Sequence, residues 1–174
     1  STAVDYFAAG TTSLPKLIEY SQYAMGQCQK RLNKSKCRPK FSNHMSCLPV
    51  GHTAYMRDSI KNAIINVGKV FLYKNYWSIK DSFWKEVRKN NINFIGVVPT
   101  ILKTIYITSS KIKKIHSLTF IGCGSSILDK ELQTKFEKKF QTKISTIYGL
   151  SEIVVANFDN LNTNHRQIDS IGDT

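Results

Sequence analysis

The segment "LTFIGCGSSILDKELQTKFEKKFQTKISTIYG", residues 118–149, decides the fold class of this chain of 174 residues. It opens with a nearly continuous apolar run over 118–124 and closes with a second strand-like run over 144–149. The middle part, 128–140, carries apolar residues at helical spacing, and these are Leu128, Leu132, Phe136 and Phe140. Continuous apolar strands are typical of parallel sheets that are covered on both faces. The segment therefore predicts a strand, a crossover helix and a second parallel strand.

The same alternation of strand and helix patterns extends through the rest of the chain. Strands are expected at 3–9, 16–21, 41–49, 68–73, 92–99 and 152–158. Helices are expected at 22–33, 53–65 and 78–91, and a further helix opens at Pro99. Ser21 and Ser78 are the expected N-caps, and proline suits the first turn of a helix. The predicted fold class is α/β, with a mostly parallel sheet flanked by helices, in a chain of one domain's length.

The composition is that of a globular protein, with 41% hydrophobic and 21% charged residues. No apolar run reaches the ~18 residues that a membrane span needs, and the first ten residues lack the features of a signal peptide. Four cysteines occur without a C-x-x-C pair or a zinc-like spacing, so we expect reduced cysteines in a cytoplasmic protein. Because the chain opens inside an apparent strand without an initiator Met, we expect it to be a piece of a longer chain.

The net charge of +13 raises the question of a nucleic-acid or other polyanionic partner. The densest basic patch, "KRLNKSKCRPK" over 30–40, holds six basic residues and no acid. Lysine outnumbers arginine 20 to 5, although arginine is the usual residue for reading bases and gripping phosphates. We therefore interpret the patch first as a solvated surface and expect no nucleic acid as partner; polyanion binding stays open as the alternative.

Three loops follow expected strands at the edge where α/β sheets bind ligands, namely 10–16, 122–126 and 149–152. The first combines glycine, hydroxyl side chains and Lys16, a composition that suits a polyphosphate but also an ordinary polar turn. In the last loop Glu152 could hold Mg²⁺, a hard cation that prefers oxygen ligands, or be a plain surface carboxylate. The four histidines are scattered, and no triad order or paired metal spacing involves them.

Six short motifs occur in a fixed order along the chain: "AAGTTSLPK" (8–16), "LPVGH" (48–52), "FIGVVPTIL" (94–102), "FIGCGSSILDKEL" (120–132), "IYGLSE" (147–152) and "SIG" (170–172). The first resembles the phosphate loop S/T-S/T-G-S/T-T-G-x-P-K of the adenylate-forming (AMP-binding) superfamily. The others resemble that family's L-P-x-x-H, V-P-T, G-G-A-P-L, Y-G-x-T-E and G-S-V-G. The family includes acyl-CoA and aryl-CoA synthetases, firefly luciferase and the adenylation domains of peptide synthetases, and "YGLSE" favours the acyl-CoA synthetase branch.

The resemblance implies an AMP-dependent ligase that activates a fatty or aryl carboxylic acid with Mg·ATP and passes the acyl group to coenzyme A. It implies that Lys16 and His52 are catalytic and that Glu152 binds Mg²⁺. Lys16 would offset charge as pyrophosphate leaves, and His52 would sit near the substrate carboxylate. Tyr148 would lie against the adenine. The implied nucleotide-binding residues are Gly10, Thr11, Thr12, Ser13, Lys16, Gly124, Ser125, Ser126, Tyr148, Gly149 and Ser151.

Several positions depart from the family pattern. Ala8 and Ala9 stand where the family has two hydroxyl residues, Ser13 and Cys123 each replace a glycine, and Ser126 replaces the proline. The family's earlier subdomain, its ribose-binding Asp and its C-terminal domain with a catalytic Lys have no counterpart here. We therefore expect residues 1–174 to be a partial AMP-binding domain, the central part of the large N-terminal domain, with little activity by itself. A catalytically inactive relic or nucleotide-binding module of the same fold stays open as an alternative.

Overall fold

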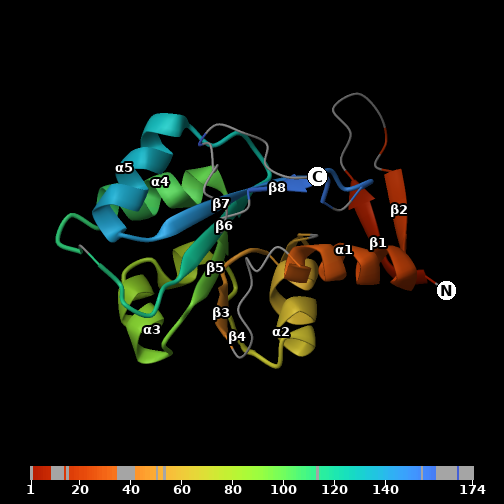
Figure 1. Cartoon of the computed structure of the whole chain (residues 1–174), viewed down its shortest axis with the longest axis horizontal. Helices are drawn as coiled ribbons and strands as arrows, with labels where there is room; N and C mark the ends of the chain where they lie inside the picture. The colour runs from red at the N-terminus through yellow and green to blue at the C-terminus, as the bar shows by residue number, and fades with distance from the viewer. Residues whose placement is uncertain are drawn as a thin grey trace.

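The structure is a computed structural model that describes residues 2–8, 14, 16–34, 42–49, 51–52, 54–112, 114–153, 155–159 and 168. Within these ranges the strands form two sheets (Figure 1). β1 (Thr2–Ala8) and β2 (Lys16–Ser21) pair as an antiparallel hairpin. The larger sheet has six strands in the order β4-β3-β5-β6-β7-β8.

The larger sheet is mostly parallel, as the sequence predicts. Its strands are β3 (Asn43–Ser46), β4 (Lys69–Leu72), β5 (Phe94–Val97), β6 (Phe120–Gly124), β7 (Lys143–Tyr148) and β8 (Asn157–Phe158). The first five run parallel to their neighbours, and only the short β8 pairs antiparallel, with β7. The predicted fold class, an α/β sheet flanked by helices, is therefore confirmed.

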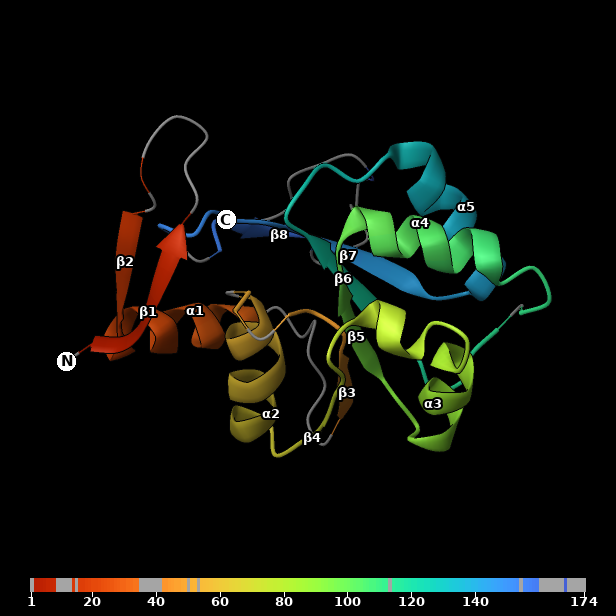
Figure 2. The ribbon, with the colours of Figure 1, turned by 180° about the vertical axis from the view of Figure 1, so that it is seen from behind.

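Helices cover both faces of this sheet. α3 (Phe83–Lys89), α4 (Pro99–Thr108) and α5 (Lys130–Phe140) gather on one side, and α1 (Gln22–Lys34) and α2 (Asn62–Ile65) lie on the other (Figure 1 and Figure 2). A π-helical stretch, Tyr55–Lys61, leads directly into α2, and a 3-10 helix, Tyr76–Ile79, precedes α3. The described helices all lack the length and apolarity that a membrane span would need.

The main core lies between the sheet and the α3–α5 layer. Alternate strand residues point into it, including Ile95, Ile121 and Ile144, each at most 1% exposed. From α5 come Phe136 and Phe140, both fully buried with ring centroids 4.4 Å apart. Each such side chain contributes about 1.5–3 kcal/mol through burial, which explains why the apolar stripe of 128–140 forms a helix here.

The opposite face of the sheet carries a different set of residues. Phe94 and Phe120 form a smaller apolar cluster there with Leu32 of α1, Val155 and Phe158. Beside them on this face lie glycines, because Gly96 of β5 is in register with Gly122 of β6, two residues after the Phe94–Phe120 pair. The face therefore combines an aromatic cluster with positions that carry no side chain.

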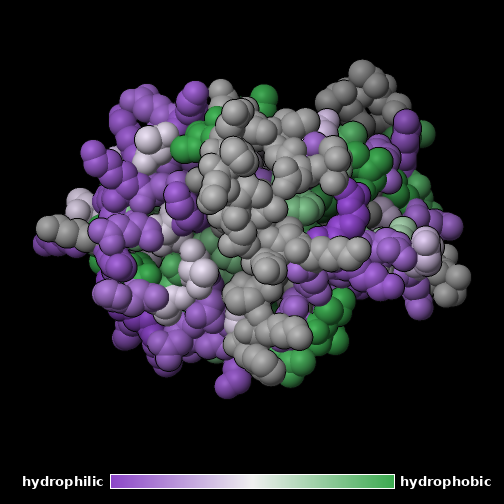
Figure 3. Space-filling view, in the orientation of Figure 1, coloured by the Kyte–Doolittle hydropathy of each residue, from purple (hydrophilic) through white to green (hydrophobic). Residues whose placement is uncertain are grey.

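The outer surface also differs between the two sides of the molecule. Hydrophilic residues cover most of the side that carries α3 and α5, whereas hydrophobic surface shows at α2 (Figure 3). Ile64 and Ile65 of α2 are 72% and 49% exposed.

Most expected elements are present with shorter bounds, and two expectations are wrong. The expected helix 78–91 is split, because the Asn75 side chain accepts a hydrogen bond from the Ser78 N–H at 3.0 Å and caps the 3-10 helix Tyr76–Ile79. Ser78 is therefore inside that helix and is not the cap of α3. The expected strand 152–158 is mostly a turn, held by a bond from Ala156 N–H to Tyr148 O at 3.0 Å, and only Asn157–Phe158 pair. The Ser21 cap is confirmed, since its Oγ accepts from Ala24 N–H at 3.1 Å.

Candidate functional site

Two adjoining cavities open where β6 and β7 end. The first, the His52 cavity, has a volume of ≈ 280 Å³ and is lined by His52, Phe94, Gly96 and residues of the loops after β6 and β7. The second, the Tyr148 cavity, has a volume of ≈ 270 Å³ and is lined by Ser126, Gln133, Tyr148 and their neighbours. Both cavities share the same four lining residues, Ser125, Ile147, Gly149 and Leu150. Only a thin layer of chain therefore separates the two spaces.

The parallel pairing of β6 with β7 explains why these loops meet. Gly124 pairs with Ile147, so the segments beginning at Ser125 and Gly149 leave the sheet side by side. A Cβ on Gly124 would lie only 3.0 Å from the Ile147 carbonyl oxygen, so the close approach of the strands needs glycine here. Ser125 follows with φ of 75°, a left-handed conformation that turns the chain away from the strand.

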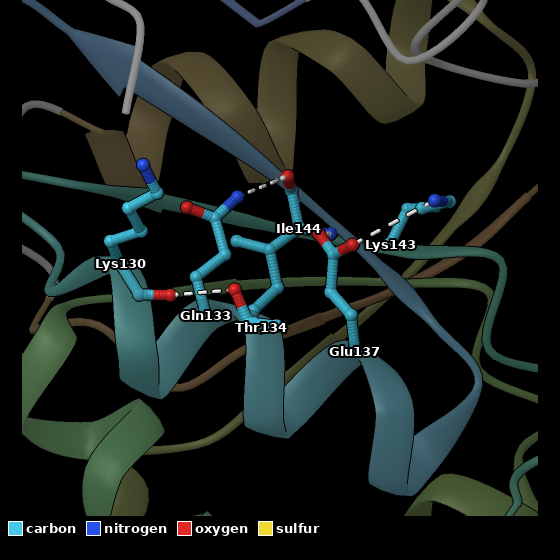
Figure 4. Close-up of polar contacts among 6 residues, drawn as sticks. All are labelled: Lys130, Gln133, Thr134, Glu137, Lys143 and Ile144. Atoms are coloured by element: carbon cyan, nitrogen blue, oxygen red, sulfur yellow. Dashed lines mark hydrogen bonds and ion pairs between the residues drawn. The ribbon is translucent and has the colours of Figure 1, made fainter. Parts of the chain in front are cut away.

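Helix α5 is tied to β7 by side chains, and this fixes the rear wall of the Tyr148 cavity. The Gln133 amide donates to the Ile144 carbonyl at 3.4 Å, and Glu137 accepts from the Ile144 N–H at 2.8 Å (Figure 4). Lys143 Nζ lies 3.8 Å from the Glu137 carboxylate. Asp129 caps the helix by accepting from Leu132 N–H at 2.7 Å.

The His52 ring has a defined orientation in its cavity. Its Nδ1 accepts a hydrogen bond from the Ala54 backbone N–H at 3.1 Å, so this nitrogen carries no proton. In the neutral ring the proton then lies on Nε2, which is 3.1 Å from Ser125 Oγ. His52 thus presents an N–H donor to Ser125 at the boundary between the two cavities.

The residues of the "YGLSE" motif line different cavities. Tyr148 is 51% exposed and lines the cavity named after it, while Gly149 lines both and Ser151 lines the His52 cavity. The Ser151 carbonyl accepts a hydrogen bond from the hydroxyl of Tyr20 on β2. This bond links the β1–β2 hairpin to the site.

Glu152 faces a different space from the rest of the "YGLSE" motif. It is exposed and lines a third cavity of ≈ 460 Å³, between β2, α1 and the turn before β8. In the part of the chain that is described, no three His, Cys, Asp or Glu side chains gather as a metal site would require. The expected role of Glu152 as a Mg²⁺ ligand therefore stays a prediction.

The predicted phosphate loop is only partly described. Gly10, Thr11, Thr12 and Ser13 lie outside the described residues, so their expected role stays a prediction. Lys16 opens β2, where it pairs with Ala8, and its side chain is exposed. It lines none of the three cavities described above.

Gly124, Ser125 and Ser126 lie together at the predicted loop, as do Tyr148, Gly149 and Ser151. The structure adds lining residues that were not among the expected site residues. Phe94, Gly96, Gly122 and Ile147 belong to the quoted motifs, and Gln133 follows one of them. The sequence signal for two of them is a glycine inside an apolar strand, at Gly96 and Gly122. Such positions often mark a close approach of ligand or backbone.

The described cysteines are all free, and two belong to the core. Burial raises the pKa of the Cys47 and Cys123 thiols to about 12. Cys123 also borders the Tyr148 cavity, but a protonated thiol is a weak nucleophile, so neither group suits covalent chemistry at neutral pH. His44 is also structural, being 1% exposed with its ring centroid 5.0 Å from that of Phe94.

Comparison with known proteins gives a consistent picture. The sequence model of the family described as AMP-binding enzyme matches residues 1–174. The chain is 23% identical to the marinolic acid–CoA ligase of Pseudoalteromonas sp. (strain SANK 73390), over 98% of this chain and 28% of that protein. It is also 23% identical to the crotonobetaine/carnitine–CoA ligase of Proteus mirabilis (strain HI4320), over 98% of this chain and 33% of that protein. The chain thus spans about a third or less of the length of these relatives.

Solved structures of similar fold are also known. The O-succinylbenzoate coenzyme A synthetase of Bacillus subtilis in complex with AMP superimposes with a TM-score of 0.85 at 17% identity, over 99% of this chain and 35% of that one. A malonyl-CoA ligase with methylmalonyl-CoA and AMP bound gives a TM-score of 0.85 at 15% identity, over 98% and 37%. At these identities the likeness concerns the fold.

Proposed function

Because the chain belongs to the AMP-binding enzyme family, we propose that it is part of an acid–thiol ligase that activates a carboxylic acid with Mg·ATP. In the first step a carboxylate oxygen of the acid bonds to the α-phosphorus of ATP. The bond from that phosphorus to the bridging oxygen breaks, and pyrophosphate leaves. In the second step the thiol of coenzyme A attacks the acyl carbon and AMP leaves.

The observation that carries this proposal is the pair of adjoining cavities that share Ser125 and Gly149. An acid in the His52 cavity and an adenine in the Tyr148 cavity would place carboxylate and α-phosphate at the shared boundary. Holding two reactants in this way replaces a bimolecular encounter by a reaction between prepositioned groups. One cavity alone would support binding, whereas two that meet support group transfer.

The side chains at the boundary suit the charges of this reaction. The Nε2–H of His52 can donate to the substrate carboxylate, because Nδ1 is engaged by Ala54 N–H. Ser151, which lines the same cavity, can contact phosphate. Tyr148 offers a half-exposed ring for stacking against adenine.

The phosphates beyond the boundary would meet the β1–β2 hairpin. We propose that Gly10–Ser13 wrap the β- and γ-phosphates and that Lys16 offsets the charge of the leaving pyrophosphate. Glu152 would supply the protein ligand to Mg²⁺, whose charge neutralises phosphate oxygens when it is bound. The bond between Tyr20 and Ser151 supports this arrangement, since it holds β2 beside the 149–152 loop.

Coenzyme A as the acceptor is supported by the relatives, which are named as acid–CoA ligases. The acid is proposed to be a fatty or aryl acid, and a cytoplasmic location is part of the proposal. Ala8 and Ala9 support a second candidate, a nucleotide-binding module without catalysis, because they remove hydroxyls that could touch phosphate or metal.

Calorimetric titration with Mg·ATP tests the proposed site. We expect the unmodified chain to bind and both Lys16→Ala and Glu152→Ala to lose most of that affinity. Lys103→Ala and Glu131→Ala are matched controls, because both residues are exposed and line none of the three cavities. A folded chain that does not bind Mg·ATP would contradict both the ligase and the nucleotide-binding module.

ATP–pyrophosphate exchange with a panel of aryl and fatty acids separates the two candidates. Measured on the longest natural form of the protein, exchange that depends on one acid supports the ligase, and Mg·ATP binding without exchange supports the module. The expectation that the chain by itself adenylates little stays a prediction, which the same measurement on residues 1–174 checks.

A further inference from the structure

The polar residues and the apolar residues that line the His52 cavity lie at different depths. Its polar groups, His52, Ser125 and Ser151, all follow strand ends. Phe94 is the first residue of β5 and Gly96 the third, so these two lie deeper along the sheet. A ligand with its carboxylate near His52 would therefore extend its other end over Gly96 towards Phe94.

The space over Gly96 is open, whereas the space over its neighbour is filled. A Cβ on Gly96 would meet no atom within 4 Å. A Cβ on Gly122, in register on the adjacent strand, would lie 3.0 and 3.1 Å from two carbons of the Phe94 ring. The Phe94 ring thus covers Gly122 and ends the cavity there.

Phe94 is held firmly in this position. It is 2% exposed, and its ring centroid lies 4.9 Å from that of Phe120 and 5.0 Å from that of His44. A buried ring with aromatic neighbours has little freedom to swing aside, because interiors are close-packed. The end wall is therefore fixed, and the cavity cannot lengthen past it.

The volume sets the size of a ligand. An apolar cavity of about 150 Å³ is enough to hold one benzene. On that scale a cavity of ≈ 280 Å³ takes about eleven heavy atoms. Benzoate and phenylacetate are within this limit, whereas laurate and longer fatty acids exceed it.

The shape of the floor favours a ring over a bent chain. Gly96 exposes flat backbone in open space, against which a planar group can lie, whereas the Phe94 ring covers Gly122 beside it. The Phe94 ring at the end of this floor suits contact with a second aromatic ring. Resting on the proposed function, we propose that the His52 cavity accepts a carboxylic acid with a single aromatic ring, and that the missing side chain of Gly96 makes the room for that ring.

The test compares acids and variants by NMR titration of the chain with benzoate, phenylacetate, propionate and laurate. We expect both aromatic acids to bind and laurate, kept below its micelle concentration, to bind at least tenfold more weakly. In Gly96→Val the ratio of phenylacetate to propionate affinity should fall at least tenfold, since even one methylene in a fitted pocket changes discrimination by about 10- to 200-fold. The same ratio in Gly96→Ala should lie between that of the parent chain and that of Gly96→Val.

Gly26→Ala is the matched control, because a Cβ on Gly26 also meets no atom within 4 Å and this residue lines none of the described cavities. It should leave every affinity unchanged. Laurate that binds as tightly as phenylacetate, or a Gly96→Val chain with an unchanged affinity ratio, would overturn the inference.

Mg·ATP binding by the unmodified chain distinguishes the failure of this inference from that of the proposed function. Mg·ATP binding without binding of either aromatic acid overturns the inference alone. Gly96-sensitive binding of phenylacetate without Mg·ATP binding supports the inference and contradicts the proposed function.

Discussion

Gly124→Ala should destabilise the chain, because this glycine lets β6 approach β7 at the boundary of the two cavities. The added Cβ would lie 3.0 Å from the Ile147 carbonyl oxygen and 3.5 Å from the Ile147 Cβ. The oxygen is a backbone atom of a strand paired with β6, so it cannot turn aside as a side chain could. Overpacking of this kind costs about 1–3 kcal/mol.

Gly96→Ala is the informative comparison, since it makes the same chemical change on the adjacent strand in open space. Glycine inside a strand is less stable than alanine by roughly 0.5–1 kcal/mol, so this variant should gain stability. The two variants should therefore differ by about 1.5–4 kcal/mol, with opposite signs relative to the parent chain.

Thermal unfolding followed by circular dichroism measures both changes. For a chain of this length about 1 kcal/mol shifts the melting temperature by about 2–4 °C, so Gly124→Ala should melt roughly 2–12 °C lower. If Gly124→Ala had the melting temperature of the parent chain, or if the melting temperature of Gly96→Ala fell as far as that of Gly124→Ala, these roles of the two glycines would be wrong.

Three further predictions concern the stability of the fold around the site. The raised pKa values of Cys47 and Cys123, about 12 in the folded chain against 9.0 unfolded, mean that only the unfolded thiols lose protons above about pH 9. The free energy of unfolding should fall between about pH 9 and pH 12 by about 4 kcal/mol per thiol. In Cys47→Ala this fall should be smaller, as measured by urea titrations at several pH values. Asp129→Ala should cost about 1 kcal/mol in urea unfolding by removing the cap on α5, and Asp129→Asn should retain the cap. Phe136→Ala should cost about 3–5 kcal/mol in the same assay, because the ring is fully buried, and a loss below about 1 kcal/mol would contradict the described core.

The fold class could be predicted from the sequence where burial leaves a periodic trace. The segment 118–149 is the clearest case, since its apolar strands are covered on both faces and its helix buries one stripe. The segment 78–91 was predicted as one helix because Ser78 is a typical cap residue. The Asn75 side chain caps the chain three residues earlier, and the helix breaks before α3. Local hydrogen bonds of this kind leave no periodic signal.

The candidate site could likewise be predicted only in part from the sequence. Its loops could be predicted because Ser125, Tyr148 and Ser151 belong to short motifs that follow strands. The roles of Phe94 and Gly96 could not, since they depend on which strands are neighbours. The pairing of β5 with both β3 and β6 brings together segments that are far apart in the sequence.

Amide NMR spectra of the isotopically labelled chain, recorded during titration with AMP, test whether a nucleotide binds where the two cavities meet. AMP carries the adenine and the α-phosphate without the phosphates assigned to the loop around Thr11. We expect shift changes concentrated at Gly124–Ser126 and Tyr148–Ser151, on the boundary of the His52 and Tyr148 cavities. Shifts confined to other surfaces of a folded chain, or no shifts at saturating AMP, would contradict it.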